Sequence, residues 1–262
     1  MIGYRDLEKG FKELGLIPQR PVIIHVALDS FDFIRGGIET LLGAVTANTY
    51  SIITPAFTYR TMVIPEDGSS NNGITYGTGR QANVMVEAFH MDMPADDTLG
   101  VFPKIFSRMP GVARSTHPIL SFYGIHAEEY LGIQSILEPL TIIEALMDRD
   151  GLVVLVNVDH TANTSIHLGE RLANRRTFTR WALIHERVVA CPNFPGCSSG
   201  FGTVTKSVEQ FSGTLDLSGL EIKAIPLRDL VATTRDMILA DPNALLCQRP
   251  DCERCNSLRQ AR

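Results

Sequence analysis

Two kinds of hydrophobic pattern alternate along the chain. In the first, a short and almost wholly apolar run, rich in β-branched residues, predicts a buried strand. The predicted strands lie at residues 20–28, 50–57, about 119–124 and 152–159, with shorter strands at 180–192 and 220–227. In the second, apolar residues recur at the spacing of one helix face. The predicted helices lie at residues 4–16, 38–48, 100–111, 141–151, 162–175 and 227–240.

The order of these elements predicts the fold class. A strand, a helix and a second strand open the chain, and this order is typical of a right-handed parallel crossover. Residues 58–80 have little periodicity and many Gly, Asn, Asp and Thr residues, which indicates a long loop of the kind that is often functional. No segment has the composition of a linker. We therefore expect an α/β fold: a single mixed-sheet domain with flanking helices over residues 1–262, a loop-rich subdomain at about 58–115, and a cysteine-containing tail at 241–262.

Composition and charge limit the function. The 262 residues are 44% hydrophobic and 20% charged, with a net charge of −5 and no dominant basic patch, so nucleic acid is not an expected partner. The N-terminal segment lacks the pattern of a signal peptide. No run approaches the roughly 18 apolar residues that cross a bilayer. We expect a soluble cytoplasmic protein, in which the five cysteines are thiols or metal ligands rather than disulfides.

The most informative polar pair is in the segment NTSIHLGE, which follows the apolar run 152–159. Asn163, Thr164 and Ser165 are residue types that cap helices, so a helix is predicted to start there. His167 and Glu170 would then share a face, at the end of a strand where ligands usually bind in α/β proteins. A histidine oriented by a carboxylate is a general base. The alternative is an ordinary exposed surface pair.

Two further clusters could bind anions. Arg114, Ser115 and His117 offer guanidinium, hydroxyl and imidazole donors in the run RSTHP, which could hold a phosphate. The alternative is a turn in which these groups satisfy the local backbone. Gly36 and Gly37 precede a predicted helix and could let its N-terminus approach an anion. The alternative there is a flexible turn between a strand and a helix.

The candidate base pair and the two candidate anion-binding clusters lie in three segments of the chain. These segments are HVALDSFDFIRGGIET (25–40), GVARSTHPILSF (111–122) and LVNVDHTANTSIHLGE (155–170). In motif, order and spacing the chain resembles the aminoglycoside 3-N-acetyltransferases, also called the antibiotic N-acetyltransferase family. Weaker similarity covers almost the whole chain. The resemblance implies the fold of that family and an acetyl-coenzyme A-dependent transfer of an acetyl group to an amine, the 3-amino group of an aminoglycoside.

The resemblance also assigns roles to single residues. His167 matches the catalytic base that deprotonates the attacking amine, Glu170 its carboxylate partner, and Thr164 a threonine near the thioester. Ser115 and His117 match positions that contact the phosphates of acetyl-coenzyme A, with Arg114 beside them. The turn that cradles the pyrophosphate and pantetheine corresponds to Asp29, Ser30, Phe31, Gly36 and Gly37. No covalent acyl-enzyme is implied, because both substrates bind together.

The chain departs from the family pattern near the acceptor. The segment from Thr54 to Gly100 is shorter than in drug-modifying members, and Asn157 and Asp159 replace glycines before the catalytic helix. The acceptor is therefore an aminoglycoside or another small-molecule amine, such as an amino sugar or an amine metabolite. A ligand-binding protein without catalysis is the alternative from another class. The sequence leaves open whether the chain is a monomer or a homodimer.

The cysteines form two spaced groups. Cys247, Cys252 and Cys255 are arranged as C-x4-C-x2-C, and Cys191 and Cys197 as C-x5-C around Pro and Gly. A structural zinc needs four ligands, and these five thiols could supply them if the tail folds back onto the domain. The alternative is a set of reduced thiols. Nothing in the role that the resemblance implies requires a metal.

Overall fold

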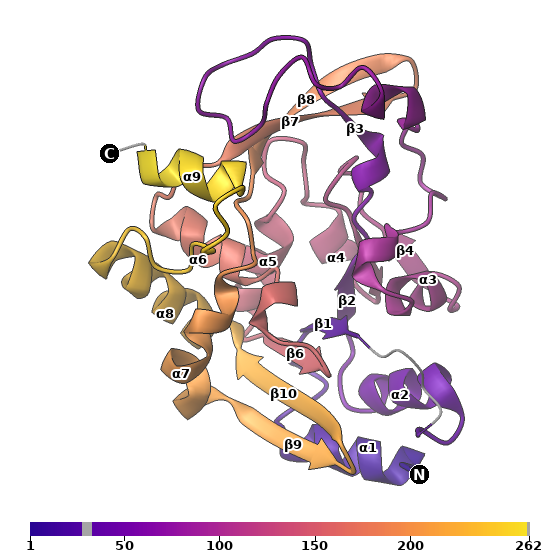
Figure 1. Ribbon diagram of the computed structural model, residues 1–262. Coiled ribbons are helices and arrows are strands. Elements are labelled where there is room, and N and C mark those ends of the chain that lie inside the picture. Colours follow the sequence, from indigo (N-terminus) through magenta and orange to yellow (C-terminus); the bar gives the residue numbers. More distant parts are fainter. Residues whose placement is uncertain (28–32, 261–262) are drawn as a thin grey trace.

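A seven-stranded mixed sheet forms the centre of the protein in the computed structural model, which describes residues 1–27 and 33–260 (Figure 1). Its strand order is β4-β5-β2-β1-β6-β10-β9. Strands β2, β1 and β6 are parallel, and the strands on either side of them pair antiparallel. The bounds are β1 Val22–Val26, β2 Ile52–Pro55, β4 Val112–Arg114, β5 Phe122–Ile125, β6 Leu152–Val156, β9 Gly213–Leu217 and β10 Leu220–Pro226. The expected mixed-sheet α/β fold is thus confirmed.

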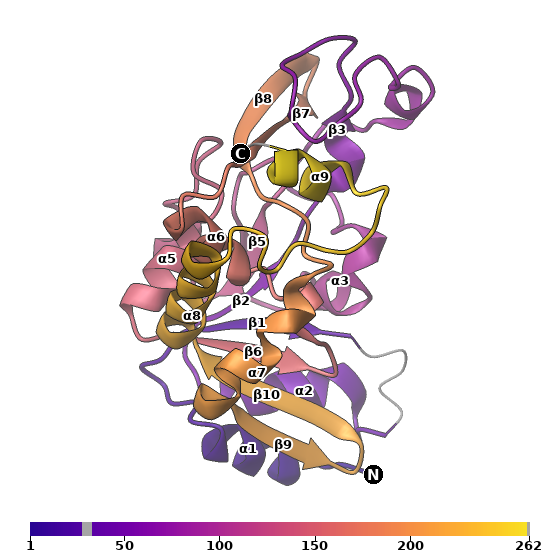
Figure 2. The same ribbon diagram turned by 60° about the vertical axis from the view of Figure 1, so that its left-hand side comes forward.

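Helices cover both faces of this sheet, because side chains of a strand point alternately to its two faces. In β1, Ile23 packs into one hydrophobic cluster, whereas Val22 and Ile24 pack into the other. Both clusters are buried, which explains why the parallel strands read as continuous apolar runs. One face carries α1 (Tyr4–Glu13), α2 (Gly37–Thr46) and α3 (Phe102–Phe106). The other face carries α4 (Glu128–Leu131), α5 (Thr141–Asp148), α6 (Ile166–Leu172), α7 (Thr205–Val208) and α8 (Leu227–Ala240), as Figure 2 shows for the larger helices.

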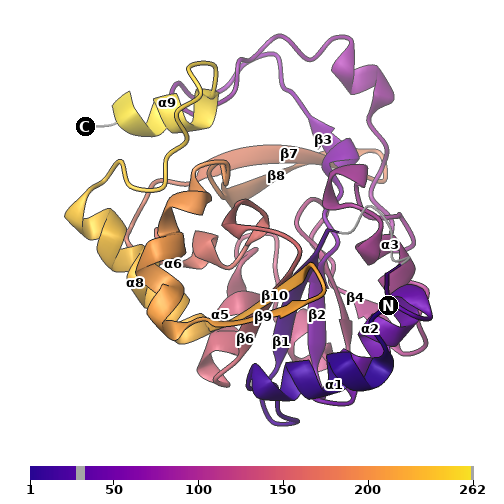
Figure 3. The same cartoon turned by 60° about the horizontal axis from the view of Figure 1, so that its bottom comes forward.

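A second, three-stranded antiparallel sheet lies at the top of the molecule in Figure 1. It consists of β3 (Met62–Val63), β7 (Phe178–Ile184) and β8 (Arg187–Phe194). Helix α9 (Glu253–Gln260) of the tail lies beside the loop that follows β3 (Figure 3). Ser257 donates a hydrogen bond to the Asn71 carbonyl at 2.7 Å, which fixes this contact. The single-turn 3-10 helices are η1 Tyr59–Thr61, η2 Ala82–Met85, η3 Asp97–Leu99, η4 His160–Ala162, η5 Phe201–Val204 and η6 Glu209–Phe211.

Most predicted elements occur at the predicted places, and the differences have local causes. The helix expected at 100–111 extends only over Phe102–Phe106. Pro103 fits its first turn, but Pro110 and Gly111, whose φ is 78°, end the regular structure that follows. Strand β3 and helix α9 were not expected, because both depend on partners far away in the sequence. Within the described residues, no helix has the length and apolarity needed to span a bilayer.

Candidate active site

Helix α6 begins at Ile166, directly after the residues Asn163, Thr164 and Ser165, and it presents His167 and Glu170 on one face. After β6 the chain passes through η4, and the Asn163 side-chain oxygen accepts a hydrogen bond from the Ser165 backbone N–H at 3.1 Å. This bond holds the backbone where the helix begins, at Ile166. Because residues three apart lie on the same helix face, the imidazole and the carboxylate meet.

The pair is buried rather than exposed, which separates it from an ordinary surface pair. His167 Nδ1 and a carboxylate oxygen of Glu170, Oε2, are 2.6 Å apart, and the two side chains are 9% and 6% exposed. The second oxygen, Oε1, accepts a hydrogen bond from Arg175 Nη1 at 2.8 Å. Burial alone would raise the pKa of Glu170, but the hydrogen bonds and charges of His167 and Arg175 outweigh it and lower the pKa. Glu170 is therefore ionised at neutral pH.

An ionised carboxylate fixes the tautomer of the histidine. A carboxylate can only accept hydrogen bonds, so His167 Nδ1 must donate, and in the neutral ring the lone pair lies on Nε2. Among the described residues Nε2 has no hydrogen-bond partner. The ring packs edge-on against Phe201, with the centroids 4.8 Å apart. The arrangement is that of a base whose free nitrogen is available to a ligand.

A cavity of about 410 Å³ lies beside this imidazole. Its walls include His25 and Ala27 at the carboxyl end of β1, Thr54 at the end of β2, and Thr164 and His167. This is the edge of the parallel strands where α/β proteins bind ligands. The volume is within the usual range for small-molecule sites.

A second, smaller cavity of about 80 Å³ also contacts His167. Thr164, His167 and Ser198 line both cavities, and Arg254 of α9 lines the smaller one. The His167 imidazole therefore lies at the junction of the two cavities. Thr164, predicted to lie near the reacting groups, is only 8% exposed and belongs to this junction.

The RSTHP segment makes contacts that differ from those implied by the resemblance. Arg114 donates to the carbonyls of Ala56 (2.9 Å) and Met91 (3.0 Å), and to Met93. Its guanidinium also lies over the Tyr123 ring, 5.0 Å from the centroid. The side chain thus connects loop and strand, as in the alternative interpretation of a turn whose groups satisfy the backbone.

Ser115 and His117 are inside the protein, 2% and 1% exposed. The Ser115 hydroxyl accepts from the Phe122 N–H at 2.8 Å. His117 Nδ1 accepts from the N–H groups of Ile119 (3.1 Å) and Leu120 (2.9 Å), and burial lowers its pKa to about 4. Neither residue lines the two cavities next to His167.

The Gly-Gly turn starts α2, as predicted. Gly36 is the N-cap residue, with φ of 84°, and Gly37 has φ of 64°, so both adopt a backbone conformation that favours glycine. A Cβ at Gly36 would lie 2.4 Å from the Thr40 hydroxyl oxygen. Asp29, Ser30 and Phe31, which the resemblance places against the coenzyme, are outside the described residues.

Of the two residues that replace family glycines, Asn157 has φ of 54°, a conformation that asparagine tolerates better than most residues. Asp159 is exposed, and its carboxylate accepts from the Thr161 N–H at 2.8 Å at the start of η4. Asp159 thus caps the N-terminus of η4, shortly after β6 ends.

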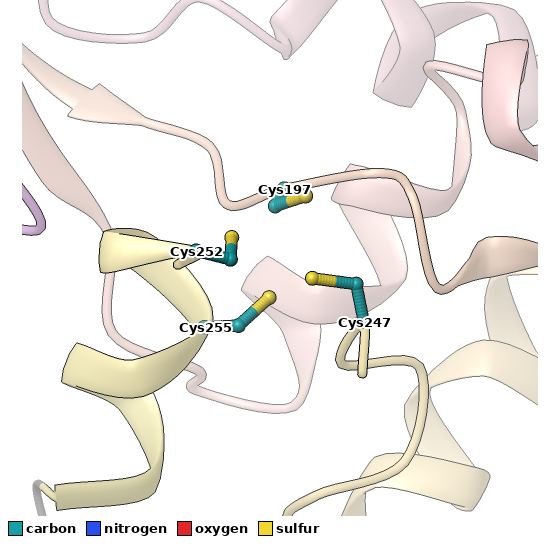
Figure 4. A group of neighbouring side chains, drawn as sticks. All are labelled: Cys197, Cys247, Cys252 and Cys255. Carbon is teal, nitrogen blue, oxygen red and sulfur yellow. The ribbon is translucent and has the colours of Figure 1, made fainter. Parts of the chain in front are cut away.

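The structure brings four of the five cysteines together. The sulfurs of Cys197, Cys247, Cys252 and Cys255 all lie within 4.8 Å of one another (Figure 4). Cys191 does not belong to this group: it lies in β8 within the main hydrophobic core, and burial raises its pKa to about 11. The C-x5-C spacing alone does not reveal that Cys191 is separate from the other four cysteines. That separation arises because β8 directs the Cys191 side chain into the hydrophobic core.

Several cavity residues were missed by the sequence interpretation. His25 and Tyr59 line the large cavity; burial lowers the pKa of His25 to about 3 and raises that of Tyr59 to about 12, so both are neutral. His25 and Thr54 lie near the ends of predicted strands, a position that could have identified them. Arg175 lies only five residues after Glu170, a proximity in the sequence that could have identified it, whereas Arg254 gave no signal because its contact with Gly196 is made through the tertiary fold.

Fold and site together define a mixed α/β protein in which a buried histidine–carboxylate pair opens onto a cavity of ligand size. Residues 23–238 match the family model described as aminoglycoside 3-N-acetyltransferase. The chain belongs to the aminoglycoside 3-N-acetyltransferase family, as the three motifs implied.

Individual relatives agree with this assignment. Aminoglycoside N(3)-acetyltransferase IV of Salmonella is 36% identical over 84 residues, a stretch that spans 30% of this chain and 32% of that protein. A mutant of aminoglycoside acetyltransferase AAC(3)-IVa, crystallised in complex with a gentamicin, has a TM-score of 0.77 and 22% identity, covering 100% of this chain and 98% of that one. The binary complex of AAC-IIIb with CoASH has a TM-score of 0.71 and 14% identity, covering 89% and 95%. At these identities the two solved structures show the fold.

Proposed function

We propose that the protein is an acetyl-coenzyme A-dependent N-acetyltransferase that acts on an aminoglycoside at its 3-amino group. The family supports the reaction, and proteins of the same fold bind a gentamicin in one solved structure and coenzyme A in another. The observation that carries the proposal is the buried His167–Glu170 pair, separated by 2.6 Å, whose imidazole lines the 410 Å³ cavity.

The residue types suit proton removal from an amine. An ammonium group is not a nucleophile, so it must lose a proton before it attacks a thioester. His167 Nε2 takes that proton, and ionised Glu170 stabilises the imidazolium through Nδ1. Acetyl-coenzyme A supplies the activated acetyl group. The new C–N bond forms, the C–S bond breaks, and the departing thiolate takes up a proton. Both substrates bind together, so the protein forms no covalent intermediate.

Thr164 is assigned a supporting role at the same place. It lies one helical turn before His167, and its backbone carbonyl accepts the His167 N–H at 3.1 Å. We assign the Thr164 hydroxyl to steady either the thioester oxygen or the departing sulfur, because Thr164 lines both cavities. A threonine hydroxyl can donate one hydrogen bond to either group.

The large cavity suits the coenzyme arm. Ala27, Pro55, Leu99 and Phe102 give it apolar walls that match the pantetheine chain. Helix α2 begins at the same sheet edge, where the N–H groups after Gly36 can receive a phosphate. We assign Arg114, Ser115 and His117 to support of the neighbouring backbone, because the Arg114 guanidinium, the Ser115 hydroxyl and His117 Nδ1 bond to backbone groups inside the protein.

A second acceptor class, a smaller amine such as an amino sugar or amine metabolite, is favoured by the charges around the pair. Among the described residues of the two cavities, the carboxylate of Asp97 is engaged by Lys104, and Arg254 adds a positive charge. A polycationic aminoglycoside is better matched by free carboxylates. Acceptor choice therefore separates the two candidates, while the chemistry at His167 is common to both.

A thiol-release assay with acetyl-coenzyme A tests the proposal. The purified protein is assayed against aminoglycosides that have a free 3-amino group and against simple amino sugars. We expect His167→Ala to lower kcat by roughly 10²–10⁴-fold, the usual contribution of a general base, with coenzyme A affinity little changed. His90→Ala, at an exposed histidine, is the matched control. Near-normal turnover by His167→Ala would overturn the assignment.

A further inference from the structure

Four buried cysteines meet at a place where two distant parts of the chain come together. Cys197 lies in the loop after β8, whereas Cys247, Cys252 and Cys255 belong to the tail that ends in α9. Figure 4 shows the three tail side chains facing the loop cysteine. Each of the four residues is at most 5% exposed, and each is a free thiol.

The distances fit a metal site. A tetrahedral tetrathiolate zinc with Zn–S bonds of about 2.3 Å has S–S edges of about 3.8 Å. The four sulfurs lie within 4.8 Å of one another, so small side-chain rotations suffice to reach those edges. Four sulfur donors in this geometry select zinc over hard cations such as Mg²⁺ or Ca²⁺.

The local backbone also favours thiolates. Cys197 Sγ accepts a hydrogen bond from the Ser199 backbone N–H at 3.4 Å, in the manner of a metal-binding turn. Cys252 and Cys255 are at the N-terminal turn of the eight-residue helix α9, where the helix dipole stabilises negative charge. The Arg249 guanidinium lies beside the Cys247 and Cys252 side chains and offsets part of that charge.

We propose that Cys197, Cys247, Cys252 and Cys255 bind one structural Zn²⁺. Binding releases the four thiol protons and leaves a site with a net charge of −2, to which Cys191 contributes nothing.

The metal would fix one wall of the catalytic site. Gly196, the residue before Cys197, is so close to the base pair that a Cβ there would lie 3.6 Å from Glu170 Oε1. Arg254, between two of the tail ligands, donates to the Gly196 carbonyl at 2.9 Å. Ser198, on the other side of Cys197, lines both cavities.

The same loop packs tightly on the tail. A Cβ at Gly200 would lie 2.4 Å from the Leu245 carbonyl oxygen and 2.7 Å from the Cys247 backbone nitrogen. Arg176, in the segment between α6 and β7, donates to the Ser257 carbonyl at 2.6 Å. Zinc therefore joins the loop 196–200 to the tail, and the tail in turn contacts the segment after α6. Loss of the zinc should displace the cavity wall that this loop forms. This effect on turnover rests on the proposed function; the metal site itself does not.

Metal content is the first test. The full chain, purified under reducing conditions without chelator, should contain about one zinc per molecule by elemental mass spectrometry. Cys255→Ala should lose the metal, and Cys191→Ala, at the buried cysteine outside the group, should retain it. Cobalt(II) should give the absorption of a tetrahedral tetrathiolate site. Zinc-free wild-type protein that shows no such cobalt spectrum, or Cys191→Ala protein that loses zinc, would overturn the proposal.

Metal removal from the wild-type protein keeps the test valid where a variant fails to fold. A mercurial reagent that displaces zinc from thiolates should release one zinc for every four cysteines that it modifies. The Tm of the protein should then fall by about 10 °C or more. In the metal-depleted protein kcat/KM for the amine should fall by about 10²-fold, because a displacement of about 1 Å at a catalytic group has effects of that size. Re-addition of zinc should restore both. Zinc release that leaves Tm and kcat/KM unchanged would contradict the positioning role. Bound zinc without acetylation of any amine would contradict only the proposed function.

Discussion

Arg175 and Glu170 form a buried ion pair, with Nη1 and Oε1 2.8 Å apart and side chains 5% and 6% exposed. Through Nη2, the same guanidinium donates to the carbonyls of Pro242 (2.9 Å) and Ala244 (2.7 Å). One side chain thus connects the carboxylate beside His167 to the start of the cysteine-containing tail, just after α8. The pair keeps the carboxylate ionised and holds it in place.

Glu170→Gln should lower activity without unfolding the protein. The amide has the shape of the carboxylate but cannot stabilise an imidazolium or impose one tautomer on His167. We expect kcat to fall by about 10²–10⁴-fold, with coenzyme A affinity changed little. Steady-state kinetics and calorimetric titration measure the two quantities. Glu129→Gln, at an exposed carboxylate, should retain full activity; a kcat for Glu170→Gln close to that of this control would remove Glu170 from the mechanism.

Arg175→Met should lower the free energy of unfolding by about 3 kcal/mol, because it leaves a buried carboxylate with one partner fewer. The exposed Arg187→Met should change it by less than about 0.5 kcal/mol. Denaturant titration compares the two variants. The pKa of Glu170 should rise when the neighbouring cation is removed, so the acid limb of the pH–rate profile should move to higher pH. An unmoved acid limb would mean that Arg175 does not act on Glu170.

Arg114→Met distinguishes a structural residue from a phosphate ligand. Arg114 donates to several backbone carbonyls, among them Ala56 and Met91. Its loss should therefore lower stability by about 2–4 kcal/mol. Loss of a contact with the bound coenzyme would raise the KM for acetyl-coenzyme A. Because Arg114 bonds to the protein backbone instead, we expect this KM to change by less than about threefold. A tenfold rise in that KM with unchanged stability would instead support the phosphate contact implied by the resemblance.

His117 makes stability dependent on pH in a defined window. Its pKa in the folded state is lowered to about 4 by burial, below the ordinary value of 6.5, so protonation favours the unfolded chain. This stability is fully present above about pH 6.5 and is lost as the pH falls toward 4, by roughly 3 kcal/mol. His117→Asn keeps an acceptor for the N–H groups of Ile119 and Leu120 but cannot titrate.

Denaturant titrations of both proteins between pH 7 and pH 4 test this. His25 and His160, whose pKa values are also lowered, contribute equally to both proteins, so the difference isolates His117. The wild type should lose more stability than the variant over this range. Parallel pH curves would show that His117 is not the titrating group.

The fold was largely predictable because the local sequence pattern of its central strands and helices is enough to identify them. The run Leu152–Val156 is apolar at every position and forms an internal strand, parallel to β1 and antiparallel to β10, that is buried on both faces. The capping residues before Ile166 placed the start of α6 closely. In contrast, β3 is two residues long and exists only because it pairs with β7, more than a hundred residues later. No local pattern contains that information.

The site was predictable to the extent that it is local. His167 and Glu170 are three residues apart, so a helix start was enough to bring them together. Arg175, five residues after Glu170, is a further local support, whereas the contact of Arg254 with the Gly196 carbonyl comes from the packing of the tail. The RSTHP segment shows the opposite case: its polar residues suggested a ligand, but they are the partners of strand and loop backbone.

The span of one helical turn between His167 and Glu170 has a consequence for how such an enzyme can diversify. The His167–Glu170 pair lies within a single short segment, whereas the surrounding cavity walls come from separate stretches around Thr54, Leu99 and Ser198. Under the proposed function, changes in those stretches can alter which amine is admitted while the His167–Glu170 pair stays intact. New acceptor preferences can thus arise by remodelling loops, without any rebuilding of the chemistry.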